Sequence, residues 1–98
     1  MVQKVIFTKT ADRAFYNIAS FLEENASLLA AEKFAQKVDA QIEKLQHYPF
    51  IGRPSGKAKT VRRVFITKHV QMMYRVVGKT IIVSDFFDTR QHPDKSKF

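Results

Sequence analysis

Six basic residues in the second half of the chain have side chains suited to chemistry on phosphate groups: Lys57, Lys59, Arg62, Arg63, Arg75 and Arg90. The planar donors of a guanidinium group bind phosphate oxygens in pairs, and arginine keeps its charge. Such residues can hold a nucleic-acid backbone, stabilise a pentacoordinate phosphorane during RNA cleavage, or bind an acidic peptide. The alternative is that they are solvated surface charge.

The closing segment "DTRQHPDK", residues 88–95, places two further chemical groups together. Arg90 and His92 follow the apolar run "TIIVSDFF" directly, and Pro93 comes next. A simple interpretation is that polar residues and a proline end a strand. The sharper hypothesis is that the strand delivers Arg90 beside Arg62 or Arg63, and that Pro93 frees the tail so that His92 can reach a target.

The sequence argues against several other kinds of site. The segment "GRPSGKA" has three residues between its glycines and an alanine after the lysine, so it does not match a phosphate-binding loop. The three histidines lie more than twenty residues apart and the chain has no cysteine, which argues against a metal site. No Gly-x-Ser-x-Gly elbow is present either. We therefore expect no metal and no cofactor.

The charge balance of the chain points to an anionic partner. Seventeen Lys and Arg residues against nine Asp and Glu give a formal net charge of +8 in 98 residues. Most of the basic residues follow Arg53, where only Asp85, Asp88 and Asp94 oppose them. This asymmetry favours a polyanion or an acidic protein as partner of the C-terminal half, although small basic domains without such a partner exist.

The hydrophobic pattern predicts a single α+β domain over residues 1–98, in the order β-α-α-β-β-β. A strand over 2–7 is followed by a helix capped by Thr10, a break at 25–27, and a second helix that ends near His47. A loop over 48–59 leads to strands at 61–66, 69–77 and 80–88, the last two joined through Gly78 and Lys79. We expect an antiparallel helical hairpin packed on one face of a four-stranded, mostly antiparallel sheet.

The apolar helical positions predict the core, and the last strand predicts a second covered face. The helical core residues are expected to be Ala11, Phe15, Ile18, Leu22, Phe34, Val38, Ile42 and Leu45. In the last strand, regular alternation puts Ile81, Val83 and Phe87 on one face and Ile82 and Phe86 on the other. Because two helices cover only one face, either a partner or a loop of a curled sheet must cover the second.

The chain carries no sequence signal for export or membrane insertion. No apolar run approaches the length of a membrane span, and the first residues lack the apolar stretch of a signal peptide. The absence of cysteine fits a reducing compartment. We expect a cytoplasmic protein with no membrane partner.

The order of elements and four segments resemble the RelE/ParE superfamily, the toxins of type II toxin-antitoxin modules. The segments are "FIGRP", "VRRVFI", the Tyr74-Arg75 pair and "IIVSDFFDTRQHP". The resemblance implies a toxin that inhibits growth and stabilises plasmids, neutralised by a cognate antitoxin encoded by the adjacent gene. It also implies binding of operator DNA through the antitoxin complex. On the second face, Met73, Ile82 and Phe86 are the residues expected to bind the antitoxin.

The superfamily contains two activities. RelE-like members cut messenger RNA on the ribosome without metal, which would give Arg63, Arg90 and His92 catalytic roles. ParE-like members inhibit DNA gyrase without turnover. Gln71 stands where an arginine is frequent in the RNases and the tail has no tyrosine, whereas "GRP" followed by "VRR" and the closing "FDTRQHP" are closer to ParE. A gyrase inhibitor is therefore the favoured interpretation. The ribosome-dependent RNase is the alternative, and a non-toxic nucleic-acid-binding module is a second one.

Overall fold

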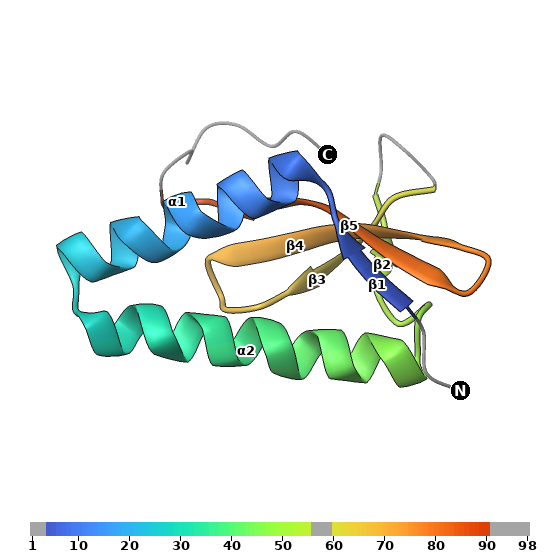
Figure 1. The fold of residues 1–98 in the computed structure, drawn as a ribbon, viewed down its shortest axis with the longest axis horizontal. Coiled ribbons are helices and arrows are strands. Elements are labelled where there is room, and N and C mark those ends of the chain that lie inside the picture. Colours follow the sequence, from blue (N-terminus) through green and yellow to red (C-terminus); the bar gives the residue numbers. More distant parts are fainter. Residues whose placement is uncertain (1–3, 56–59, 91–98) are drawn as a thin grey trace.

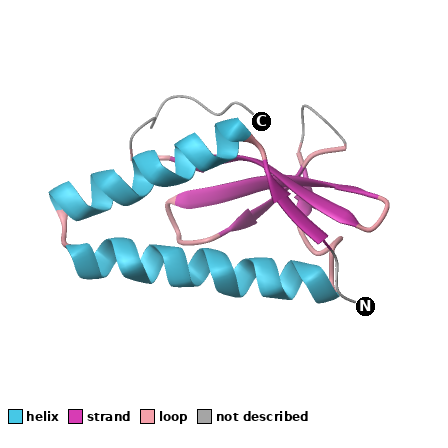
Figure 2. Cartoon of the chain, in the orientation of Figure 1, coloured by secondary structure: helices cyan, strands magenta, loops and turns pink. Residues whose placement is uncertain are grey.

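The computed structural model describes residues 4–55 and 60–90, and it contains two helices followed by most of a mixed sheet (Figure 1). The elements, in chain order, are β1 (Lys4–Phe7), α1 (Lys9–Asn25), α2 (Leu28–His47), β2 (Arg53–Pro54), β3 (Arg62–Phe65), β4 (Val70–Val77) and β5 (Thr80–Asp88). The two helices form the predicted antiparallel hairpin, and together they cover one face of the sheet (Figure 2). No described helix has the length and apolar character needed to cross a membrane.

Each helix begins at a hydroxyl residue that caps it. The Ser27 hydroxyl accepts a hydrogen bond from the Ala30 amide at 3.0 Å, as the sequence predicts for the break before α2. The predicted cap of α1 was wrong by two residues: Thr8 is the N-cap, accepting from the Ala11 amide at 3.0 Å, and Thr10 lies inside the helix. Both threonines are suitable caps, but only Thr8 is held in place by β5, whose Val83 carbonyl accepts its amide hydrogen at 3.0 Å.

Within residues 4–55 and 60–90, the sheet has five strands rather than the predicted four, in the order β1-β5-β4-β3-β2. The additional strand, β2, pairs Arg53 with Arg63 and Pro54 with Arg62. It falls in the segment predicted as a loop on account of its prolines and glycines. A strand with Pro54 is possible here because β2 is at the edge of the sheet, where the missing proline amide costs no hydrogen bond. The β4–β5 hairpin turns at Gly78 and Lys79 as predicted, with a positive φ of 60° at Gly78.

A β-bulge at Ser84 changes which face each later residue of β5 occupies. Tyr74 pairs with Val83 and Met73 pairs with Asp85, so Ser84 is an extra residue in β5 opposite the Met73–Tyr74 step of β4. Ile81 and Val83 face the helices before the bulge, and Phe86 faces them after it. The predicted assignment of Phe86 to the second face and of Phe87 to the helix face was therefore wrong, since a single inserted residue inverts the alternation.

The core follows the predicted helical stripe closely. Six of the eight predicted helical core residues are buried, namely Ala11, Ile18, Leu22, Phe34, Val38 and Leu45. Phe15 and Ile42 are partly buried and pack against this cluster. The Phe15 ring lies 5.3 Å from the Phe34 ring and 5.9 Å from the Phe86 ring, measured between centroids. These aromatic contacts join both helices to β5.

The face of the sheet away from the helices, called the open face below, is partly buried and partly exposed. Met73 and Phe87 are buried there, whereas Ile6 and Val77 are exposed. Ile82, the register partner of Ile6 and Arg75, is partly buried. The open face therefore presents an apolar strip at its β1 side, beside the exposed Arg75.

We predict that Thr8→Val lowers the free energy of unfolding by about 1–3 kcal/mol. The Thr8 hydroxyl caps α1 and also donates to the carbonyl of the bulge residue Ser84 at 3.1 Å, and valine can do neither. Thr10→Val is the matched control, because Thr10 is exposed on α1. Urea unfolding that gave equal losses for both variants would contradict this role of Thr8.

Candidate functional site

The connection between α2 and β2 begins with a tight turn, Tyr48–Ile51. The Ile51 amide donates to the Tyr48 carbonyl at 3.3 Å, which closes the turn. Pro49 occupies the second position, where its fixed φ suits a turn of this kind. With Gly52, these residues are called the 48–52 turn below.

The buried Tyr74 of β4 holds the 48–52 turn through its hydroxyl. This hydroxyl donates to the Pro49 carbonyl at 2.8 Å and accepts from the Gly52 amide at 2.9 Å. Burial raises the pKa of Tyr74 above its usual 10.0, against smaller lowering effects of the Gly52 amide and the Arg62 charge. The phenol is therefore a neutral structural hydrogen-bonding group.

Close packing at Gly52 leaves no room for a side chain. A Cβ atom there would lie 2.6 Å from the Tyr74 hydroxyl oxygen and 3.0 Å from the Arg63 carbonyl oxygen. The glycine in "FIGRP" thus has a steric cause. It allows the turn to approach β3 and β4 closely enough for the Tyr74 hydrogen bonds.

Arg62, which the sequence analysis predicts to bind the target, makes contacts within the chain. One of its guanidinium nitrogens donates to the Phe50 carbonyl at 3.1 Å and to the Gly52 carbonyl at 2.8 Å. Its guanidinium carbon lies 5.1 Å from the centroid of the Phe50 ring. Arg62 therefore helps to fix the 48–52 turn, through its hydrogen bonds to two carbonyls and its contact with the Phe50 ring.

Two of the hollows beside α2 are lined by basic side chains. The first has a volume of about 610 Å³ and lies against β2 and β3; it is lined by Gln41, Lys44, Ile51, Arg53, Arg63, Val64 and Phe65. The second, of about 410 Å³, lies at the β3–β4 connection; it is lined by Leu22, Ala30, Lys33, Phe34, Lys37, Thr67, Lys68, His69, Val70 and Arg90.

Together the hollows follow α2 from Ala30 to Lys44, a length of about 21 Å. No acidic residue is among the described residues that line them. We call this region the basic groove. Its positive lining suits an anionic partner, whether a nucleic-acid backbone or an acidic protein surface.

Arg90 is paired with a buried carboxylate. Its Nε and one terminal nitrogen each lie 3.1 Å from an oxygen of Asp88, and its backbone amide donates to Asp88 Oδ1 at 2.9 Å. The Asp88 side chain is fully buried, and the Arg90 guanidinium carbon lies 5.8 Å from the Phe21 ring centroid on α1. Arg90 thus neutralises Asp88 and joins the end of β5 to α1.

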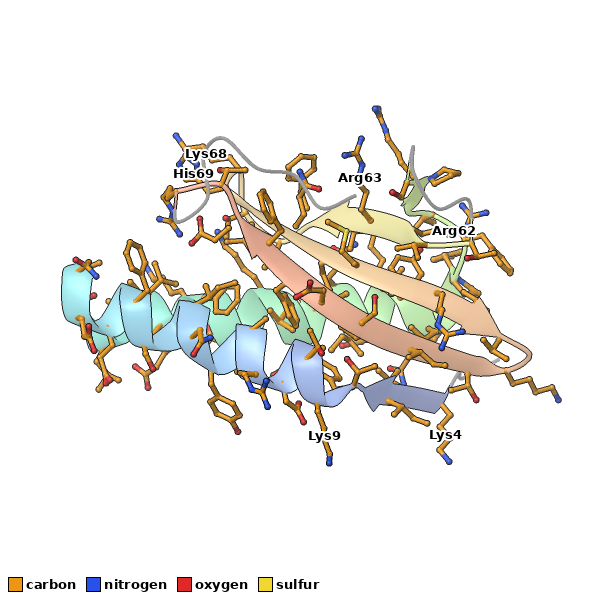
Figure 3. The ribbon with its side chains drawn as sticks, turned by 90° about the horizontal axis from the view of Figure 1, so that it is seen from above. Lys4, Lys9, Arg62, Arg63, Lys68 and His69 are labelled. Atoms are coloured by element: carbon orange, nitrogen blue, oxygen red, sulfur yellow. The ribbon has the colours of Figure 1, made fainter. Side chains whose placement is uncertain are left out.

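The structure does not bring Arg90 beside Arg62 or Arg63, so that expectation was wrong. Arg63 pairs with Met73, which pairs with Asp85, and Asp88 lies three residues farther along β5. The three residues from Asp85 to Asp88 alone correspond to about 10 Å along β5. The Thr89 amide donates to the His69 carbonyl at 2.9 Å, which places the Arg90 segment at the Lys68–His69 end (Figure 3). Figure 3 shows Arg63 and then Arg62 farther along the sheet.

The other predicted site residues have different positions. Arg75 is exposed on the open face, whereas Lys57, Lys59 and His92 lie outside the described residues. Of the residues predicted to bind an antitoxin, Met73 is buried on the open face and Ile82 is partly buried there. Phe86 lies in the core under the helices because of the bulge, and so it is not on the face that the prediction required.

Six basic residues of the groove were missed by the sequence prediction: Lys33, Lys37, Lys44, Arg53, Lys68 and His69. Lys33, Lys37 and Lys44 recur at intervals of four and seven residues, which places them along one side of α2. That spacing is the signal that was available. The sequence does not show that this side of α2 lies beside β3, and so the spacing alone does not predict a shared hollow.

Comparison with known proteins defines the class of this protein. Residues 5–93 match the family described as "ParE toxin of type II toxin-antitoxin system, parDE". The chain belongs to this family and is a toxin of the type II toxin-antitoxin class. No protein with a curated description gave a match.

Solved structures with the same fold support this assignment. The chromosomal ParDE system of Pseudomonas aeruginosa has a TM-score of 0.75 at 22% identity, covering 89% of this chain and 96% of the other. The toxin-antitoxin complex RelBE2 of Mycobacterium tuberculosis has a TM-score of 0.61 at 18% identity, covering 90% and 99%. The YoeB/ParE toxin of Agrobacterium tumefaciens has a TM-score of 0.60 at 16% identity, covering 87% and 96%.

We predict that Tyr74→Phe lowers the free energy of unfolding by about 1–3 kcal/mol at neutral pH, because the Pro49 carbonyl and the Gly52 amide lose their partner. Tyr48→Phe, at an exposed site, is the control. The folded pKa of Tyr74 is raised, so its stabilising effect is complete below pH 10.0 and declines as the pH rises above it. Urea unfolding below and above this pH should show the free energies of unfolding of the unaltered protein and of Tyr74→Phe converging as the pH rises. A constant difference would contradict the assignment.

We predict that Arg90→Ala destabilises the fold by about 1–3 kcal/mol, since the buried Asp88 carboxylate loses two charged donors. Adding Asp88→Asn should recover part of this loss by removing the unpaired charge. Arg75→Ala is the control, because Arg75 is exposed. If thermal unfolding shows Arg90→Ala to be no less stable than Arg75→Ala, the ion pair is not structural.

Proposed function

We propose that this ParE-family toxin inhibits DNA gyrase in the cytoplasm, without turnover of its own, and that a cognate antitoxin neutralises it. The observation that carries the choice of gyrase over RNA cleavage is the position of Arg90. A phosphorane is stabilised by donors that converge on one phosphate. Arg90 instead neutralises Asp88, at a distance from Arg63, so these two of the residues expected of an RNase do not converge on one point; His92 lies outside the described residues.

The basic groove is the surface that we propose to face the target. Arg53 and Arg63 line its wider part with Lys44, and no described acidic residue lines it. Gyrase acts on DNA, so both acidic protein surface and phosphate backbone are available partners for these cations. Lys57 and Lys59, which precede β3 in the chain, remain proposed contacts on the basis of charge alone.

We propose that the antitoxin is an acidic protein, encoded by the adjacent gene, that binds the open face. Ile82 is its proposed central contact, with the exposed Ile6 and Val77 beside it and Arg75 as the charged group. The P. aeruginosa and M. tuberculosis neighbours are described as toxin-antitoxin systems or complexes, which supports an antitoxin partner here. Binding to operator DNA would then occur through the toxin-antitoxin complex.

The test is to incubate the purified protein with gyrase and supercoiled plasmid. We expect gyrase-linked DNA breaks, and we expect added antitoxin to prevent them. A parallel reaction contains ribosomes translating a defined message. Message cut at defined positions, with gyrase unaffected, would overturn the proposal in favour of the RNase, and His92→Ala should then abolish cutting.

A further inference from the structure

The 48–52 turn exposes three large apolar side chains within four consecutive residues. Tyr48 is 64% exposed, Phe50 is 62% exposed and Ile51 is 45% exposed. Single exposed apolar residues are normal on protein surfaces, but a contiguous group frequently marks a binding site. Aromatic side chains of this kind are also the commonest energetic centres of protein interfaces.

The backbone of the turn is fixed before any partner binds. The Tyr74 hydroxyl bonds Pro49 and Gly52, Arg62 bonds the carbonyls of Phe50 and Gly52, and the Ile51 amide bonds Tyr48. Most backbone polar groups of the turn thus have a partner within the chain, while its large apolar side chains are exposed. An ordered loop loses little conformational entropy on association, which favours tight binding.

The surroundings of the turn define the chemistry of its partner. Ile51 lines the wider hollow of the basic groove together with Lys44, Arg53 and Arg63. A complementary surface would therefore have an apolar pocket with carboxylates at its rim. A nucleic-acid strand fits less well, because Arg62 already occupies one face of the Phe50 ring and directs its donors to backbone carbonyls.

We propose that the 48–52 turn is the element by which the toxin docks on its protein target, inserting Phe50 and its neighbours into an apolar pocket rimmed by acidic residues. This inference rests on the proposed function for the identity of that target, gyrase. It assigns the target and the antitoxin to different surfaces, the 48–52 turn and the open face.

The test compares Phe50→Ser with Leu29→Ser. Leu29 is 58% exposed and lies in the first turn of α2, about 30 Å along the helix from its other end, so the control removes similar apolar area far from the turn. Affinity for purified gyrase is measured by surface plasmon resonance, and urea unfolding verifies that both variants are folded. We expect Phe50→Ser to weaken binding by about 30-fold and Leu29→Ser to leave it unchanged.

A second readout separates this inference from the proposed function. Growth inhibition is measured in cells for the same variants, and we expect Phe50→Ser to lose toxicity selectively. If the unaltered protein does not bind gyrase but Phe50→Ser still loses toxicity, gyrase is wrong and the docking role of the turn stands. If the unaltered protein binds gyrase and Phe50→Ser binds equally well, the docking role is overturned alone. Selective loss of binding to a single-stranded oligonucleotide, with gyrase binding intact, would also overturn it.

Discussion

The extra residue at Ser84 is the constraint on which the rest of this fold depends. Its carbonyl accepts a hydrogen bond from Thr8, which caps α1, and its own hydroxyl donates to the Met73 carbonyl at 3.3 Å. The same residue inverts the alternation of β5, which directs Phe86 into the helical core. One bulge therefore positions the first helix, the aromatic core contacts and, two residues after Phe86, the buried carboxylate of Asp88.

The basic residues divide into two groups with different physical roles. Arg62 and Arg90 make hydrogen bonds within the chain, one to the carbonyls of the 48–52 turn and the other to Asp88. Arg53 and Arg75 are exposed and are available to partners. The formal +8 already counts Asp88 against Arg90, so this ion pair leaves the net charge unchanged. Among the described residues, several basic side chains line the groove beside α2 and no acidic side chain does.

Sequence periodicity predicted the helices, the order of elements and most of the core, because α2 has a regular apolar stripe and Ser27 is a clear cap. The faces of β5 were not predictable, because "IIVSDFF" is apolar on both faces and a bulge leaves no distinct pattern in such a strand. The roles of Arg62 and Arg90 were missed for a related reason. Their partners, the Phe50 and Gly52 carbonyls and the Asp88 carboxylate, depend on strand register rather than on local sequence.

The parallel pairing of β1 with β5 also affects how the protein folds during translation. Thr8 and Ser84, which hydrogen bond at this junction, are 76 residues apart. At the usual rates of synthesis, about 4–15 s separate the appearance of the two. The nascent chain cannot complete its sheet or bury Phe86 in that interval, so β1 and both helices are synthesised well before β5, the strand against which they pack.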